Sequence, residues 1–564
     1  MGQYNLTSIN YPVLTGKRLQ LVAAALDSAL LRPLLLPQLL NSGGLLKLRA
    51  LQLDEAPTHN PLYHRESAPV EPFDSSRMLG EVVRGDGLGQ SGFRSVRDLA
   101  QAFRIGDTTP LKIARQLLEA IEKGDRGERP LRAFSAIDQA EVLAQATAST
   151  ERIAAGQSVG VFDGVPIAFK EELDVQGYPT TVGTRFLGRN PASRDATVVA
   201  RLRAAGATII GKTNMHEIGI NPRSGNPHHG TVRNPYDLDR DAGGSSSGSA
   251  AAVAAGLCPL AVGADGGGSI RIPAALCGVV GLKATYGRIS GHGSFPLDWS
   301  VGHLGPMGAS VDDVVLAYAA MAGADPLDPH TQHQPALNVS DFEDEVLGDQ
   351  PPLRLGIYRE WFNHAEPEVV AICEAMLHQL ADCGAIIEEI EIPELDELRI
   401  AHAVTILSEM AASMANYPDN WSDLSAATRI SLTIGKAATS VDYLQAQRIR
   451  TRAMACFAEV FKQVDVVISP STAMVAPLIP ANSLSHGLAD LGSVTELMRF
   501  AVPGNMTGLP AISFPVGYSR AGLPVGMQAM GRPWEEQLLF RVARTAERLA
   551  DRRVPPGYND LLGR

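Results

Sequence analysis

Two runs rich in glycine and serine hold the side chains of this sequence that are best suited to chemistry. Ser245 and Ser246 lie in the first run, residues 243–249, and Ser269 follows three glycines, residues 266–268, in the second. A serine hydroxyl becomes a good nucleophile only when a base takes its proton. Successive N–H groups without side chains can bind a phosphate or the oxyanion of a tetrahedral intermediate. The two runs therefore predict either acyl chemistry at serine or phosphate binding.

The residues after the three glycines favour acyl chemistry. A P-loop needs a lysine and a Ser or Thr after its last glycine, and a dinucleotide site needs Gly-x-Gly-x-x-Gly at a strand-to-helix turn. Here Ser269, Ile270 and Arg271 follow the glycines instead. Two structural alternatives stay open from the residues alone: a glycine turn with an incidental serine, and serines that only cap the next helix. One serine is enough for a cap, whereas the first run has four.

A lysine is the candidate base. Lys170 ends the apolar run 165–169, so a strand would carry it into the protein interior. An apolar setting favours the neutral amine, which can accept a proton. The alternatives are a lysine that extends to solvent, or one that pairs at the surface with nearby acidic residues such as Glu171 and Glu172. Together with the serine runs, Lys170 predicts a serine hydrolase without a histidine base.

The elements around these residues predict an α/β fold. Residues 250–256 form an apolar helix between the two serine runs, and from residue 95 onward strands alternate with helices. Such alternation predicts a mostly parallel twisted sheet with helices on both faces. Helices are expected over 96–103, 110–121, 196–205 (capped by Asp195), 368–382 and 535–549, and strands over 208–210, 353–358, 386–392 and 464–468.

Composition excludes several classes of function. The net charge of −12 over 564 residues argues against a general nucleic-acid binder. The five cysteines are odd in number and form no Cys-x-x-Cys pair, which argues against a disulfide framework or a zinc site and favours the cytoplasm. His292, His303 and His402 lack metal-ligand spacing, so we interpret them as ordinary polar or buried residues. No metal is expected.

The N-terminal segment has two interpretations. Residues 17–51 are rich in leucine at helical spacing, but Asp27, Arg32, Pro33 and Pro37 interrupt any apolar run long enough to span a bilayer. The helices could cap a hydrophobic surface, or lie in a membrane interface. The pattern alone favours the cap. We therefore divide the chain into residues 1–94, a helical extension and wrapping segment, and residues 95–564, a catalytic domain. An exposed leucine-rich extension would favour a homodimer.

Seven motifs in order resemble the amidase signature family, and the resemblance covers about residues 95–550. Two departures, Ser-Ser-Ser-Gly-Ser at 245–249 and Asp-Gly-Gly-Gly-Ser at 265–269, are similar to the plant-type fatty acid amide hydrolases within it. That subgroup carries a similar N-terminal extension, which strengthens the membrane interpretation. The motifs span residues 164–170, 211–215, 243–249, 265–273, 281–288, 505–511 and 522–528.

The resemblance implies a fold and a set of roles. The fold is a single large mixed sheet, and no cofactor is required. Ser269 is implied as the nucleophile, Ser245 as a bridging serine after a cis peptide bond, and Lys170 as the distal base. Further positions with implied roles are Gly266, Gly267, Gly268 and Ser269 for the oxyanion, Gly219 and Ile220 for the acyl side, and Ser246 and Arg271 as supports.

The implied reaction is hydrolysis of a linear amide to an acid and an amine through an acyl-enzyme. Lipophilic N-acyl amides such as N-acylethanolamines are the expected substrates of a cytoplasmic protein that also contacts membranes peripherally. Alternatives are an amidase for small or aryl amides and the glutaminase subunit of a tRNA-dependent amidotransferase. The extension of 94 residues suits the last poorly. Residues 291–303 and 401–452 are expected to contact the acyl chain and the leaving amine.

Overall fold

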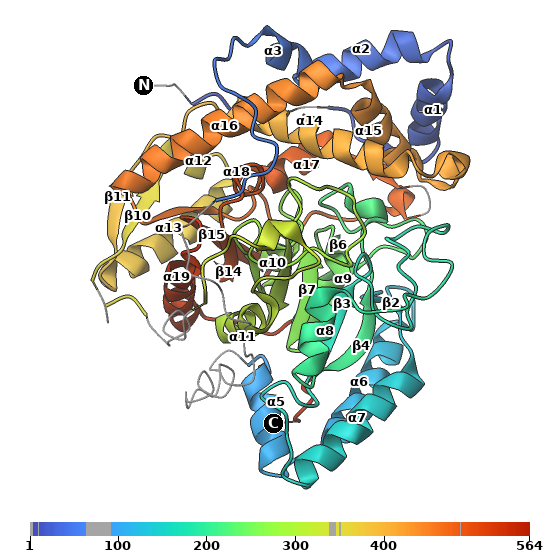
Figure 1. The fold of residues 1–564 in the computed structure, drawn as a ribbon, viewed down its shortest axis with the longest axis vertical. Coiled ribbons are helices and arrows are strands. Elements are labelled where there is room, and N and C mark those ends of the chain that lie inside the picture. Colours follow the sequence, from blue (N-terminus) through green and yellow to red (C-terminus); the bar gives the residue numbers. More distant parts are fainter. Residues whose placement is uncertain are drawn as a thin grey trace.

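The computed structural model describes residues 4–9, 11–63, 92–337, 346–348, 351–484 and 487–563. Much of the predicted wrapping segment, residues 64–91, lies outside this part of the chain. Figure 1 shows a twisted sheet through the middle of the molecule, with three N-terminal helices lying over a separate helical layer at the top.

A single sheet of eleven strands forms the frame of the described residues, in the order β11-β10-β12-β15-β14-β8-β9-β7-β3-β4-β2. Two further sheets, β1 with β13 and β5 with β6, have two strands each. The strands are β1 (Leu14–Thr15), β2 (Phe134–Ala136), β3 (Pro166–Lys170), β4 (Thr208–Thr213), β5 (Arg233–Asn234), β6 (Asp237–Asp241), β7 (Leu260–Ala264), β8 (Val280–Lys283), β9 (Leu304–Gly308), β10 (Arg354–Ile357), β11 (Ile386–Glu389), β12 (Val466–Pro470), β13 (Leu488–Ala489), β14 (Ala511–Tyr518) and β15 (Pro524–Gly531).

The large mixed sheet is confirmed, but the prediction that it is mostly parallel is wrong. Parallel pairing occurs in two groups, β11-β10-β12 and β7-β3-β4, and the strands between and beyond them pair antiparallel. Only parallel neighbours need a long crossover connection, and the sequence pattern detects those crossovers. β14 and β15 are instead joined by the short segment 519–523, which permits an antiparallel hairpin.

Helices cover both faces of the sheet. A Cβ on Gly526 of β15 would meet Ala275 of α10. A Cβ on Gly531, on the opposite face of the same strand, would meet Leu539 of α19. The helices in the catalytic part are α5 (Val96–Arg104), α6 (Pro110–Gly124), α7 (Gln139–Ala154), α8 (Thr197–Ala204), α9 (Ser247–Ala254), α10 (Arg271–Cys277), α11 (Val311–Met321), α12 (Arg359–Phe362), α13 (Pro367–Asp382), α14 (Leu395–Met414), α15 (Ala426–Ala437), α16 (Ser440–Gln463), α17 (Leu491–Met498), α18 (Val502–Thr507) and α19 (Glu536–Leu549).

Local signals explain where several helices begin. Ser95 and Asp98 form a capping box on α5, and Thr109 caps α6 with Pro110 in its first turn. The predicted cap of α8 is wrong, because Ala196 is the cap residue and makes no side-chain bond there. Asp195 accepts a hydrogen bond from Arg203 at 2.6 Å instead, since the guanidinium in the last turn of α8 satisfies it better.

The N-terminal helices pack on the helical layer formed by α14, α15 and α16. These helices are α1 (Gly16–Asp27), α2 (Arg32–Ser42) and α3 (Leu45–Ala50). One side of α1 buries Leu19 and Leu26 against α15. In α3, Arg49 forms an ion pair with Asp442 of α16 at 2.8 Å. Side-chain contacts thus fasten this extension to the catalytic part.

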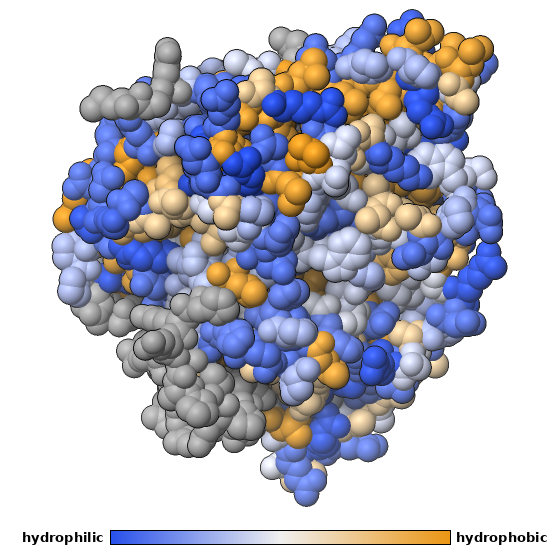
Figure 2. Space-filling model, turned by 45° about the horizontal axis from the view of Figure 1, so that its top comes forward, coloured by the Kyte–Doolittle hydropathy of each residue, from blue (hydrophilic) through white to orange (hydrophobic). Residues whose placement is uncertain are grey.

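Leucines of α2 and of the turn between α1 and α2 are exposed to solvent. Leu30 is 82% exposed and Leu34 is 67% exposed, and apolar side chains gather over this corner of the molecule in Figure 2. No single helix of the described residues is long and apolar enough to cross a membrane, although α1 and α2 pass that test as a pair bent by 111°.

Candidate active site

Lys170 lies at the end of β3 and points into the interior, as its apolar run predicts. Its Nζ donates hydrogen bonds to Ser245 Oγ at 2.9 Å and to the carbonyl of Ala264 at 3.3 Å. The side chains of Lys170 and Glu172 are 2% and 7% exposed, and Nζ lies 3.0 Å from Glu172 Oε2. The acidic partner that the sequence suggests at the surface is therefore inside the site. A buried carboxylate at this distance stabilises a positive charge on Nζ.

The first serine run turns sharply before α9. The peptide bond between Gly244 and Ser245 is cis, as the family resemblance implies. A Cβ on Gly244 would lie 2.5 Å from the carbonyl oxygen of Arg223, so only glycine fits there. Ser246 fastens the turn to the sheet, because its hydroxyl accepts a hydrogen bond from Ala264 N–H at 3.2 Å and donates to the carbonyl of that residue at 3.1 Å.

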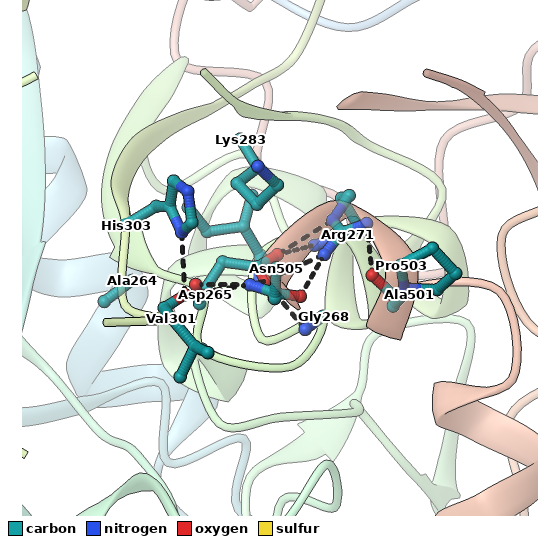
Figure 3. A network of polar contacts seen from close by, with 12 residues as sticks. Ala264, Asp265, Gly268, Arg271, Lys283, Val301, His303, Ala501, Pro503 and Asn505 are labelled. Atoms are coloured by element: carbon teal, nitrogen blue, oxygen red, sulfur yellow. Dashed lines mark hydrogen bonds and ion pairs between the residues drawn. The ribbon is translucent and has the colours of Figure 1, made fainter. Parts of the chain in front are cut away.

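The second serine run is shaped by a buried ion pair. Asp265 accepts hydrogen bonds from the N–H groups of Gly268 at 2.7 Å and Ile270 at 3.1 Å. Arg271 donates to both oxygens of the Asp265 carboxylate at 3.0 Å, and Asn505 donates to the same group. Figure 3 shows Asp265, Arg271 and Asn505 pointing toward one another. Burial by itself would raise the pKa of Asp265, but the Arg271 guanidinium holds it well below its usual range.

This arrangement changes the expected set of oxyanion donors. Gly268 N–H is already bonded to Asp265, so it is not free to bind an oxyanion. Among the described residues, the N–H groups of Gly266, Gly267 and Ser269 have no acceptor. The carbonyl of Gly266 accepts a hydrogen bond from His402 Nε2 at 2.7 Å, which fixes its orientation. Burial lowers the pKa of His402 to about 4, so this imidazole is neutral near pH 7.

Ser269 lies at the boundary between two cavities of different character. One, of about 280 Å³, has a mixed lining that includes many polar side chains, among them Lys170 and Ser245; we call it the polar cavity. The other, of about 300 Å³, extends to the N-terminal helices. The polar cavity is lined in part by Glu172, Ser294, Asp298, His292, Asp328 and His330. The second is mainly apolar, with Val22, Leu39, Leu40, Leu45, Val404, Ile406, Leu407, Ile430 and Ile434 in its wall.

The predicted acyl-side residues lie where the two cavities meet. Gly219 ends the 3-10 turn Glu217–Gly219 and lines both cavities, whereas Ile220 lines the apolar one. A Cβ on Gly219, whose φ is +69°, would come within 3.3 Å of Ser245 Oγ. All the site residues predicted from the sequence therefore lie around the two cavities or directly behind them. Gly268 differs only in the role of its N–H group.

Several residues of this site have no role that the sequence alone predicts. Asn505 belongs to the motif at residues 505–511, but nothing in the sequence predicts its hydrogen bond to Asp265, 240 residues away. The sequence suggests Glu172 only as a surface partner. Asp298 lies in the segment 291–303 that is expected to contact substrate, but no motif singles it out. Among the described residues, no group of three or more His, Cys, Asp or Glu side chains could hold a metal ion.

Comparisons with known proteins identify the family of this chain. The amidase family model matches residues 115–540. The chain is 39% identical to a fatty acid amide hydrolase from Medicago truncatula, over 99% of this chain and 98% of the relative. It is 35% identical to a glutamyl-tRNA(Gln) amidotransferase subunit from a Cyanothece strain, over 80% of this chain and 96% of the relative.

A solved structure gives the same fold. It comes from a vestigial protein complex described as revealing the evolutionary origins of an s-triazine catabolic enzyme, and it superposes with a TM-score of 0.75. The two sequences are 31% identical over 82% of this chain and 100% of the other. The family match, the relatives and the fold agree: the chain belongs to the amidase signature family and is an amidase, a hydrolase acting on the carbon–nitrogen bonds of amides.

Proposed function

We propose that this chain cleaves lipophilic N-acyl amides, such as N-acylethanolamines, through a relay of Lys170, Ser245 and Ser269. The observation that carries the proposal is the position of Ser269 between an apolar cavity and a polar cavity that holds the lysine and the second serine. An acyl chain would occupy the first cavity and the leaving amine the second. Clefts of this size with a few convergent polar groups are typical binding sites.

The proposed chemistry begins with proton transfer away from Ser269. Ser245 takes the proton of Ser269 while Lys170, as the neutral amine, takes the proton of Ser245 along their 2.9 Å hydrogen bond. Glu172 stabilises the ammonium group that forms, because its carboxylate lies 3.0 Å from Nζ. The Ser269 oxygen attacks the amide carbonyl and forms a tetrahedral intermediate.

The loop that carries Ser269 would stabilise that intermediate. Its oxyanion would be held by the N–H groups of Gly266, Gly267 and Ser269. As the carbon–nitrogen bond breaks, the proton returns through Ser245 to the leaving amine, and an acyl-enzyme remains on Ser269. Water then attacks the ester under the same relay, which releases the acid and regenerates the serine.

The wall of the apolar cavity supports a long acyl group. Val22, Leu39 and Leu45 belong to the N-terminal helices, so the cavity extends from Ser269 to the segment with exposed leucines. We infer that this segment contacts a membrane and admits lipophilic substrate. The relatives named fatty acid amide hydrolase match 99% of the chain, which includes this segment, whereas the amidotransferase relative leaves about a fifth of the chain unmatched. The homodimer stays a prediction.

Covalent labelling tests the assignment of the nucleophile. Ser269→Ala should abolish hydrolysis of an N-acylethanolamine by the purified chain alone and should abolish labelling by a fluorophosphonate probe. Ser294→Ala is the matched control, because Ser294 lines the same polar cavity without contacting the relay. Labelling that persists in Ser269→Ala at another serine would refute the assignment. Hydrolysis of short aryl amides without any long-chain amide would favour the alternative substrate class.

A further inference from the structure

Asp298 presents a carboxyl group to the polar cavity beside the loop that carries Ser269. A Cβ on Gly266 would lie 1.8 Å from Asp298 Oδ2, and a Cβ on Gly302 would lie 2.7 Å from Asp298 Oδ1. The carboxyl group therefore occupies a slot that exists only because both positions are glycine. Asp298 lines the polar cavity together with Ser269 and is absent from the wall of the apolar one.

The carboxyl group has no hydrogen-bond partner among the described residues. Neighbouring side chains in the same cavity wall are bonded: Glu172 contacts Lys170, and Asp328 accepts a hydrogen bond from Gly291 N–H at 2.8 Å. Asp298 is half-buried, and a carboxyl group that loses part of its hydration without gaining a partner is costly unless a ligand or solvent satisfies it. Its place in the wall of the polar cavity puts it on the leaving-amine side of the proposed reaction.

We propose that Asp298 is a specificity-determining residue that hydrogen-bonds a neutral polar group, such as a hydroxyl, on the leaving amine. The inference rests on the proposed function of the two cavities. It adds the residue that selects amides of short hydroxylated amines over alkylamides. The amine would leave past Asp298, while the acyl chain stays in the apolar cavity.

The surroundings of Asp298 favour the selection of a neutral group. Burial raises the pKa of this carboxyl group well above its usual range, and the carboxyl groups of Glu172 and Glu409 raise it further. Lys170 opposes this shift and Asp265 adds to it. This direction favours the protonated carboxylic acid, which has one O–H donor and keeps an acceptor oxygen. Such a group matches a hydroxyl and offers no negative charge to an ammonium group.

Three amides with the same acyl chain test the inference on the full chain. They are the N-(2-hydroxyethyl), N-propyl and N-(2-aminoethyl) amides, which differ only in the terminal group of the amine. The wild type should prefer the hydroxyethyl amide over both others in kcat/KM. Asp298→Ala should reduce the preference over the propyl amide by about tenfold, the value of one hydrogen bond. Asp298→Asn, a neutral group of the same shape, should retain most of it.

Two further measurements separate recognition from loss of fold or of chemistry. Ile434→Trp, which narrows the apolar cavity, should change the acyl-length profile and leave the ratio of hydroxyethyl to propyl amide unchanged. If Asp298→Ala is inactive, the affinities of the hydroxyethyl and propyl amides are measured instead, in Ser269→Ala and in the double variant Ser269→Ala, Asp298→Ala. The ratio of these two affinities then replaces the ratio of the kcat/KM values. An unchanged ratio in an active or binding-competent Asp298→Ala variant overturns the inference.

The remaining outcomes are also decisive. A wild-type preference for the aminoethyl amide that Asp298→Asn abolishes would show an ionised carboxylate and would overturn neutral recognition. If the wild type hydrolyses none of the three amides, the proposed function fails, and the inference fails with it. That result differs from hydrolysis without discrimination, in which the proposed function stands and the inference alone is overturned.

Discussion

Replacing Arg271 with methionine should destabilise the fold and disable the loop that carries Ser269. Both Arg271 and Asp265 have side chains that are 0% exposed, so solvent does not screen their ion pair. Removing one partner of such a pair costs about 3–5 kcal/mol, because the other charge is left buried without compensation. Arg271 also donates to Ala501, Gln528 and Asn505, so the substitution releases three further acceptors.

Asp265 gives this destabilisation a defined pH dependence. Burial alone would raise the pKa of Asp265, but Arg271 holds it well below its usual value, near 4 in an unfolded chain. In the wild type the ion pair therefore contributes stability above about pH 4, which is lost only as the pH falls toward the folded-state pKa. Without the cation, burial raises the pKa of Asp265 in the folded state, so the variant gains stability when this carboxyl group is protonated. The stability difference should shrink as the pH falls.

Urea unfolding at about pH 7.5 and about pH 5 measures both effects. With a slope of about 3 kcal/mol per molar urea, a loss of about 4 kcal/mol lowers the midpoint by about 1 M. The double variant Asp265→Asn with Arg271→Met should recover part of the loss, because no unpaired charge remains. Equal midpoints for the wild type and Arg271→Met, or a difference that is the same at both pH values, would refute this reasoning.

Two further variants probe the N-terminal helices and the apolar cavity. The double variant Leu30→Glu, Leu34→Glu should reduce co-sedimentation with lipid vesicles several-fold without lowering the melting temperature, because both leucines are exposed. Ile105→Glu, which changes another exposed apolar residue, is the control. Equal co-sedimentation of the wild type, the double variant and Ile105→Glu would contradict the membrane contact. Ile434→Trp should lower kcat/KM for long-chain amides about 10- to 100-fold and spare short-chain amides, since overfilling a cavity costs about 1–3 kcal/mol. Equal losses for long-chain and short-chain amides would argue against an acyl chain in this cavity.

Much of the site could be predicted because its residues lie in short, continuous motifs. Lys170 follows five apolar residues, and the interior position at the end of β3 follows from that pattern. The glycines around Ser245 and Ser269 are likewise local signals, because there is no room for a side chain at such positions: a Cβ on Gly244 would lie 2.5 Å from a carbonyl oxygen. The large α/β sheet follows from the alternation of strands and helices. Its antiparallel centre does not, because strand order depends on contacts between distant segments.

The sequence by itself determined the types of chemical group and the local backbone that presents them: a lysine, two serines and two glycine-rich turns. Only the tertiary structure decided which groups face one another. Glu172 pairs with the lysine inside the site, Gly268 N–H is occupied by Asp265, and Asp298 reaches the polar cavity from a loop without a motif. The physical reason is that hydrogen bonds, ion pairs and cavities depend on distances of a few ångströms between residues far apart in the chain. Local sequence patterns determine conformation over a few residues, but they do not specify those distances.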